Sequence, residues 1–188
     1  DPTLVLKISN EFQKLFETKM LELMKQIASG SKNKENTPEK KLPDSLKNAI
    51  ENTKITSSSG VIIAKTKTPM FQLFKQGTKL QKKAKAKRNE TKEERKLATT
   101  GFIDFQVIGS EGCVDINSFR EGISYKENNL MERPYSINKI SNEEVKTMDS
   151  LLEIIYKMKK VKFPKNKLRY IYDLKRTDKL EEYQKKME

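Results

Sequence analysis

The sequence predicts a mainly α-helical chain with a small β-hairpin, in an extended, non-globular arrangement of short helices and linkers that orders on its partners. Of the 188 residues, 35% are hydrophobic and another 35% are charged, whereas ordinary globular domains have about 45–50% apolar and about 25% charged residues. The apolar residues fall into short stripes with helical spacing, separated by polar stretches. The chain therefore has too few apolar residues for one large core, and we expect the apolar stripes to be buried on other molecules.

Residues 1–29 are expected to form an amphipathic N-terminal helix, from about Pro2 to Ala28. Proline suits a first helical turn, and Gly30 suits the stop. Steps of three and four residues create one apolar face, which contains Val5, Ile8, Phe12, Phe16, Met20, Leu23 and Ile27. Two interpretations stay open: this face packs on the protein's own core, or it docks on another subunit in a groove or a short coiled coil. The candidate partner-binding residues here are Phe12, Phe16, Met20 and Leu23.

Residues 30–68 are interpreted as a polar linker, rich in Ser, Lys, Asn, Thr and Pro. It contains one short helical stretch, residues 44–50, and a Thr-Pro pair at Thr37 with the spacing that proline-directed kinases favour. The apolar run at residues 61–64 either adds a strand to a partner's sheet edge or makes a buried local contact.

Residues 69–98 are interpreted as an apolar plug followed by a basic nucleic-acid-binding segment. The plug contains Phe71 and Phe74, which are further partner-binding candidates. This segment has ten basic and three acidic residues and so carries +7 of the net charge of +13. We expect residues 79–88 to be disordered or loosely helical alone, because Leu80 has nothing to pack on, and to order when phosphates neutralise the lysines. A separate helix is expected from about Thr91.

Residues 99–140 are predicted to contain the hairpin. A strand at 102–108, a turn at 109–112 and a return strand at 113–116 have suitable compositions. Asp104 and Asp115 would lie on facing strands, where two carboxylates can act as an acid/base pair or share Mg²⁺. Neither has a supporting motif, so we expect both to be solvent-facing. A short helix near residues 118–122 and an irregular polar stretch follow.

Residues 141–188 are expected to form a C-terminal helical region. Ser141 and Glu144 have the spacing of a capping box, which starts a helix that reaches about Lys160. Pro164 opens the next helix, with three apolar residues pointing inward, namely Leu168, Ile171 and Leu174. Thr177 is expected to cap a last helix.

The composition argues against an enzyme. The chain has no histidine, which excludes Ser-His-Asp and Cys-His catalysis and His-containing zinc sites within it. Its one cysteine, Cys113, cannot form an internal disulfide and is interpreted as a small buried hydrophobe. No phosphate-binding glycine loop and no membrane-spanning run occur. We expect no cofactor, no metal and no small-molecule substrate.

Two lysine-rich clusters indicate nucleic-acid binding, because clustered cations release condensed counterions when they bind phosphates. The candidate nucleic-acid-binding residues are Lys79, Lys82, Lys83, Lys85, Lys87, Arg88, Lys159, Lys160, Lys162, Lys165, Lys167 and Arg169. Lysine acts on phosphate as a point charge, whereas base reading favours arginine. Binding is therefore expected to tolerate sequence changes and to weaken with salt. Residues 82–85 also fit the short pattern that nuclear import receptors read.

These observations lead to the hypothesis of a non-enzymatic scaffold or assembly subunit of a large nuclear ribonucleoprotein. A nucleolar particle in ribosome biogenesis and rRNA processing is the most natural host, with RNA and several protein subunits as partners and no membrane. Two alternatives stay open: a chromatin- or kinetochore-associated adaptor that binds DNA, and a mitochondrial ribosomal protein.

Overall fold

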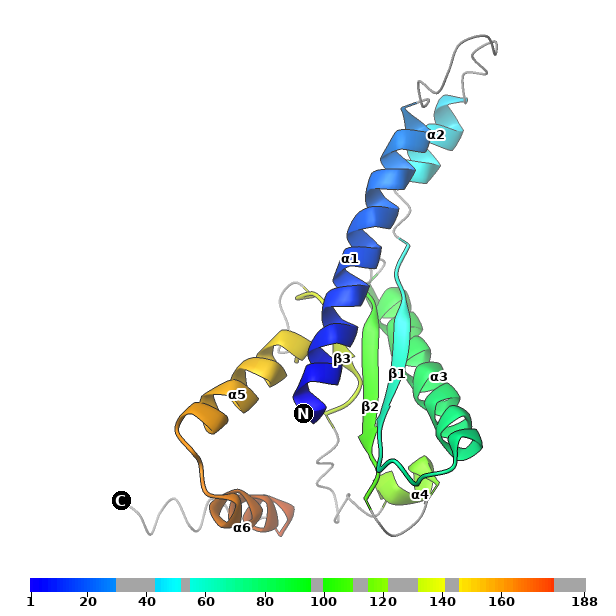
Figure 1. Cartoon of the computed structure of the whole chain (residues 1–188). Helices are drawn as coiled ribbons and strands as arrows, with labels where there is room; N and C mark the ends of the chain where they lie inside the picture. Colours follow the sequence, from blue (N-terminus) through cyan, green and yellow to red (C-terminus); the bar gives the residue numbers. More distant parts are fainter. Residues whose placement is uncertain are drawn as a thin grey trace.

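The structure, a computed structural model, describes residues 1–29, 43–51, 55–95, 100–109, 115–121, 132–140 and 146–177. The chain is mainly helical, with a small three-stranded mixed sheet (Figure 1). The helices are α1 (Pro2–Ala28), α2 (Asp44–Glu51), α3 (Met70–Arg95), α4 (Ile116–Glu121), α5 (Met148–Lys160) and α6 (Lys165–Arg176). The strands are β1 (Ser58–Ile63), β2 (Phe102–Val107) and β3 (Tyr135–Ser136). Thr37 and Cys113 lie outside the described residues.

The bounds predicted for the first helix are confirmed. Asp1 caps α1, because its side chain accepts a hydrogen bond from Thr3 N at 2.9 Å, and such a cap satisfies an amide that has no partner within the helix. The short helix predicted at residues 44–50 is also confirmed as α2, which packs along the C-terminal half of α1 (Figure 1).

The C-terminal helices match the prediction in part, because α5 ends at Lys160 and α6 begins directly after Pro164, as expected. The Thr147 hydroxyl accepts a hydrogen bond from Ser150 N at 3.1 Å and caps α5. The helix therefore starts after Thr147 and not at the predicted capping box, which lies in residues 141–145, outside the described residues. Thr177 follows the end of α6, where its N–H donates to Asp173 O at 3.1 Å. The last predicted helix falls on residues 178–188, which are also outside the described residues.

The sheet differs from the predicted hairpin. β2 pairs in parallel with β1, in a register that runs from Ser58 opposite Phe102 to Ile63 opposite Val107, and it pairs antiparallel with β3. Most of the predicted turn and return strand falls on residues 110–114, which lie outside the described residues, and the last residue predicted for that strand, Ile116, begins α4 instead. Parallel strands need a crossover connection, and α3 provides it between β1 and β2.

One face of the sheet is covered by α3, which approaches β1 very closely (Figure 1). A Cβ at Gly60 would lie 2.3 Å from Gly77 O and 2.6 Å from Gln81 N, so only glycine permits this contact. Leu80 and Ala84 of α3 are fully buried. The expectation that the lysine-rich block has nothing to pack on was therefore wrong, and α3 runs continuously from the plug through the block to its end.

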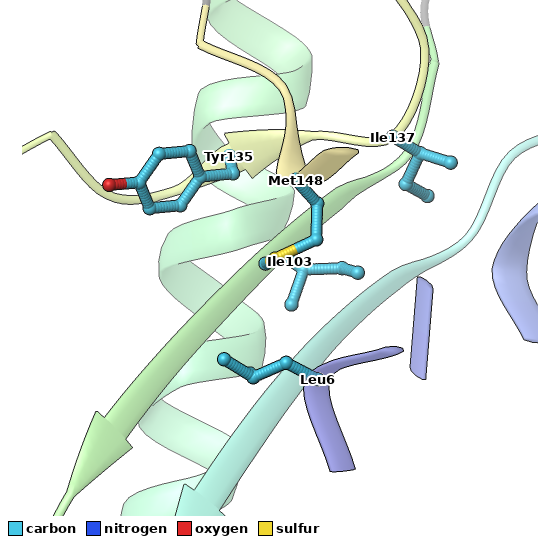
Figure 2. Close-up of a cluster of buried hydrophobic side chains, with 5 residues drawn as sticks. All are labelled: Leu6, Ile103, Tyr135, Ile137 and Met148. Atoms are coloured by element: carbon cyan, nitrogen blue, oxygen red, sulfur yellow. The ribbon is translucent and has the colours of Figure 1, made fainter. Parts of the chain in front are cut away.

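The other face of the sheet holds the main apolar core (Figure 2). Its five residues come from five different segments of the chain. They are Leu6 of α1, Ile103 of β2, Tyr135 of β3, Ile137 directly after β3, and Met148 of α5. Phe105 stacks on Tyr135 with ring centroids 6.1 Å apart. In contrast, α6 has no buried residue among those described, so the prediction that Leu168 and Ile171 point inward was wrong.

Glu17 of α1 holds the start of β2. Its Oε1 accepts from Gly101 N at 2.6 Å, and its Oε2 accepts from Asn138 Nδ2 at 3.0 Å. A Cβ at Gly101 would lie 2.0 Å from Ser57 O and 2.8 Å from Glu17 Oε1. The absence of a side chain at Gly101 therefore lets the helix, the strand and the segment before β1 meet at one point.

Candidate nucleic-acid interface

The outer face of α3 carries the exposed lysines of the first basic cluster. Leu80 and Ala84 anchor the opposite side of the helix in the fold. Lys82 and Lys85 are exposed, because Lys82 lies about half a turn from both buried residues and Lys85 about a quarter of a turn from Ala84. The described residues provide no acidic partner for either ammonium group. The core thus presents these two charges to solvent on a fixed helix.

Other cations of this cluster have partners within the chain. Lys79 donates to Asp115 Oδ1, and Lys87 pairs with Glu90 at 3.2 Å. The hydrogen bond from Lys79 is the main reason that the pKa of the Asp115 carboxyl is held below its usual value, and the amide of Asn117 also lowers it. Lys79 therefore contributes to the fold as well as to the charge of the α3 surface.

The two aspartates considered as a catalytic or magnesium-binding pair do not act as a pair, because each binds its own cation. Asp104 is fully buried and accepts from Arg120 Nη1 at 2.9 Å and from Arg120 Nη2 at 2.6 Å. The prediction that Asp104 faces solvent was wrong, because β2 is covered on both faces. Each carboxylate is engaged by a different cation, one by Arg120 and Asp115 by Lys79.

The second basic cluster lies at the end of α5, in the turn that follows and on α6. Lys159 is held by the start of α1, because its Nζ donates to Asp1 Oδ2 at 2.7 Å and to Thr3 Oγ1 at 2.9 Å. The remaining predicted members are exposed and have no ion pair with another described residue; they are Lys160, Lys162, Lys165, Lys167 and Arg169. Residues 157–176 contain nine basic residues and one acidic residue, so this region is strongly cationic.

Lys162 has an unusual backbone conformation in the turn between α5 and α6. Its φ is +50°, in the left-handed region that glycine usually occupies at the end of a helix. The Phe163 N–H donates to Met158 O at 2.9 Å, and the Lys162 N–H donates to Lys159 O at 3.1 Å. These two bonds form a Schellman motif, with lysine at the strained position.

The structure does not bring the two basic clusters together. α3 covers one face of the sheet, whereas α5 contributes Met148 to the core on the other face (Figure 1). Tyr170 and Tyr172 of α6 are 49% and 41% exposed, which leaves aromatic surface beside the second cluster. Sequence reasoning missed Lys75, which is exposed on α3; its spacing of seven residues from Lys82 indicates the same helix face.

The predicted partner-binding residues are largely accessible. Phe71 and Phe74 at the start of α3 are 77% and 78% exposed, and Phe12 of α1 is 65% exposed. Leu23 is also exposed, whereas Phe16 and Met20 of α1 are half-buried.

Among the described residues, no helix is both long and apolar enough to span a membrane. The same residues contain no cluster of three or more metal-ligating Cys, Asp or Glu side chains. Comparisons with protein-family models, curated proteins and solved structures found no match to this chain. The function is therefore inferred from the chemistry of these surfaces.

Proposed function

We propose that the chain is a non-enzymatic scaffold subunit of a large nuclear ribonucleoprotein, with a nucleolar particle in ribosome biogenesis and rRNA processing as its host. It binds RNA phosphates through the exposed lysines of α3 and of the α5–α6 region, and its exposed apolar residues dock on neighbouring protein subunits. Contact with these partners orders the polar segments of the chain.

The observation that carries this proposal is the set of exposed lysines that lack acidic partners among the described residues. Lys82 and Lys85 project from a helix that Leu80 anchors in the core. Lys165 and Lys167 project from α6. Fixed ammonium groups without internal partners attract polyanions, and each phosphate that they neutralise releases counterions.

The backbone of Lys162 supports the same function. A non-glycine residue in the left-handed conformation costs about 1–2 kcal/mol, and such strain is found most often at functional positions. Glycine at this turn would relieve the strain but would remove an ammonium group from the middle of the second cluster. Lysine at this strained position is consistent with a role for its charge in binding.

A filter-binding titration of the full chain against structured RNA, over a series of salt concentrations, tests the proposal. The variant Lys82→Gln/Lys85→Gln and the variant Lys165→Gln/Lys167→Gln should each weaken binding. Each should also reduce the slope of log affinity against log salt by roughly 1.4–1.8, because two phosphate contacts are lost. The matched control is Lys7→Gln/Lys25→Gln, which removes two exposed charges from α1 and should leave the slope unchanged.

Equal slopes for all three variants and the unchanged protein would overturn the proposed interface. A strong preference for duplex DNA over RNA would instead favour the chromatin adaptor. RNA that co-purifies with the full chain from cells identifies the particle, since mitochondrial and nucleolar RNAs differ in sequence.

A further inference from the structure

The orientation of α1 is the reverse of that expected for an amphipathic helix. Helices in soluble proteins normally turn their apolar face to the core. Here a continuous set of large apolar residues in the first four turns of α1 is 44–65% exposed, namely Leu4, Val5, Ile8, Phe12 and Leu15. The N-terminal part of the predicted apolar face is thus present on the helix, and the described residues leave it largely uncovered.

The side of α1 that packs on the fold is mostly polar. Asn10 is fully buried, and Gln13 is 2% exposed. Asn10 Nδ2 donates to Asp149 Oδ1 of α5 at 2.7 Å, while Ser9 Oγ lies 3.3 Å from Ser59 Oγ of β1. Asn10 Oδ1 and Gln13 Oε1 are buried without a hydrogen-bond partner among the described residues. Burial of such atoms is unfavourable, so α1 holds this orientation although its own packing is poor.

The spacing of the exposed residues is that of a coiled-coil seam. Val5, Ile8, Phe12 and Leu15 are separated by three, four and three residues, which are the steps between the two core positions of a heptad. The contacts that α1 makes with α5 involve Asn10 and Lys14, which lie on the opposite side of the helix, whereas Ser9, which contacts β1, borders the seam. The seam therefore faces away from the fold.

We propose that α1 pairs antiparallel with α1 of a second copy of this chain. The spacing of the seam permits this arrangement, because its four positions are symmetric about residue 10. In that register Val5 lies opposite Leu15 of the second copy, and Ile8 lies opposite Phe12 of the second copy. Two-fold symmetry repeats each contact and closes the dimer.

The charges at the ends of the seam complement this register. Asp1 and Lys19 lie one step beyond the apolar residues at either end, and the antiparallel register places Asp1 of one copy beside Lys19 of the other. Both side chains are more than half exposed, at 54% and 65%. A parallel pair would instead place Lys19 against Lys19 of the second copy, and like charges repel. Asp1 and Lys19 also form ion pairs within each copy, with Lys159 and Glu22, so the contact between copies would extend these pairs and favour the antiparallel orientation.

The available area suits a dimer of moderate affinity. An aromatic side chain has roughly 150–250 Å² of surface and a large aliphatic one somewhat less, so Leu4 and the four seam residues together leave on the order of 500 Å² per copy uncovered. The pair would bury about 1,000 Å² from these residues alone, which reaches the lower end of specific interfaces. The charged flanking residues add to this area.

Sedimentation of the nuclease-treated full chain over a range of concentrations tests the pairing. The unchanged protein should be dimeric at the higher concentrations. Ile8→Asp should raise the dimer dissociation constant by at least roughly 100-fold, because it places charge in an apolar seam. The matched control is Ile154→Asp on α5, where the isoleucine is 52% exposed; this variant should leave dimerisation unchanged. Circular dichroism of both variants checks that the fold is retained.

Disulfide trapping then tests the orientation. In a Cys113→Ser background, the Ile8→Cys protein and the Phe12→Cys protein should form a mixed disulfide when combined. Disulfides that link two copies of the same variant, with none between the Ile8→Cys and Phe12→Cys proteins, would overturn the antiparallel register. A monomer at every concentration, or an Ile8→Asp dimer of unchanged strength, would overturn the pairing itself. Because nucleic acid is removed, either result is independent of RNA binding.

Discussion

Arg120 of α4 and Asp104 of β2 form a two-pronged ion pair inside the fold. The guanidinium group donates to both carboxylate oxygens, at 2.9 and 2.6 Å, and the two residues are 8% and 0% exposed. Arg120 Nε is buried without a partner among the described residues. The short α4 therefore depends for its position on this pair and on the buried Ile116.

Removal of one partner from this pair should be strongly destabilising. Asp104→Asn leaves the buried guanidinium without its countercharge, and we expect the free energy of unfolding to fall by about 3–5 kcal/mol. Urea denaturation measures this change. Glu153→Gln is the control, because Glu153 and Lys157 form an exposed ion pair; it should change stability far less than Asp104→Asn. A similar effect of the two variants would show that burial does not strengthen the Asp104 contact.

The double variant Asp104→Leu/Arg120→Met extends the same measurement. It removes both charges and replaces them with apolar groups, so it should be less destabilised than Asp104→Asn. A loss equal to or larger than that of Asp104→Asn would contradict this account of the pair.

Two glycines at the contact between β1 and α3 should respond in opposite ways to alanine. Gly60→Ala places a methyl group 2.3 Å from Gly77 O and should destabilise the protein by about 1–3 kcal/mol, because helix and strand must separate. At Gly77 the nearest atom to an added Cβ is Ile62 Cδ1 at 3.8 Å. Gly77→Ala should therefore stabilise α3 by about 0.5–1 kcal/mol. Thermal melting compares the two variants, and a shift of the same sign in both would contradict the packing described.

The stability of the fold should fall at alkaline pH through Tyr135. Burial raises the pKa of the Tyr135 phenol above its ordinary value; Glu132 adds to this effect, whereas Arg133 opposes it. The unfolded chain ionises this group near pH 10. The contribution of Tyr135 is consequently complete below about pH 10 and is lost as the pH rises toward the higher pKa of the folded state.

Tyr135→Phe should flatten this alkaline decline, since phenylalanine has no proton to lose. Urea denaturation at neutral and alkaline pH provides the comparison. The control is Tyr156→Phe, because Tyr156 is 67% exposed; this variant should show the same decline as the unchanged protein. An identical pH dependence in all three proteins would exclude Tyr135 as its source.

Substitution of Lys162 should separate backbone strain from charge. Lys162→Gly relieves the left-handed conformation and should stabilise the end of α5 by about 1 kcal/mol. Hydrogen exchange at the Phe163 amide, which donates to Met158 O, should slow by about fivefold. Lys162→Ala keeps a Cβ and should leave this exchange rate unchanged. Both variants lose the ammonium group, so both should bind RNA equally weakly; a difference between them in affinity would point to backbone geometry instead.

Residue composition predicted the strand β2 but not the strand with which it pairs. Its residues were recognisable as a strand because β-branched and aromatic side chains dominate it. A nearby return strand was favoured, because residues 109–112 have turn composition and residues 113–116 have strand composition. The structure instead pairs β2 with β1, about forty residues earlier. Close packing of Gly60 on α3 and the apolar core on the other face stabilise this longer connection, and neither contact is visible in local sequence.

The candidate interface was also predictable only in part, because local sequence shows where lysines gather but not which of them have partners in the fold. The two lysine-rich clusters follow directly from residue order. The division of the first cluster into Lys82 and Lys85, which face solvent, and Lys79, which binds Asp115, depends on the buried position of Leu80. Sequence reasoning treated Leu80 as unsupported, because it packs on β1, which lies well before it in the sequence.

By itself, the sequence determined where α1 begins and ends, which residues share its apolar face, and where positive charge accumulates. These properties depend on caps, spacing and composition within a few residues along the chain. Only the tertiary structure decided that the polar side of α1 meets the sheet, that Asp104 is buried against Arg120, and that β1 and β2 are neighbours. Such outcomes depend on contacts between distant segments, where the combined packing of many side chains outweighs the preference of any single helix or strand.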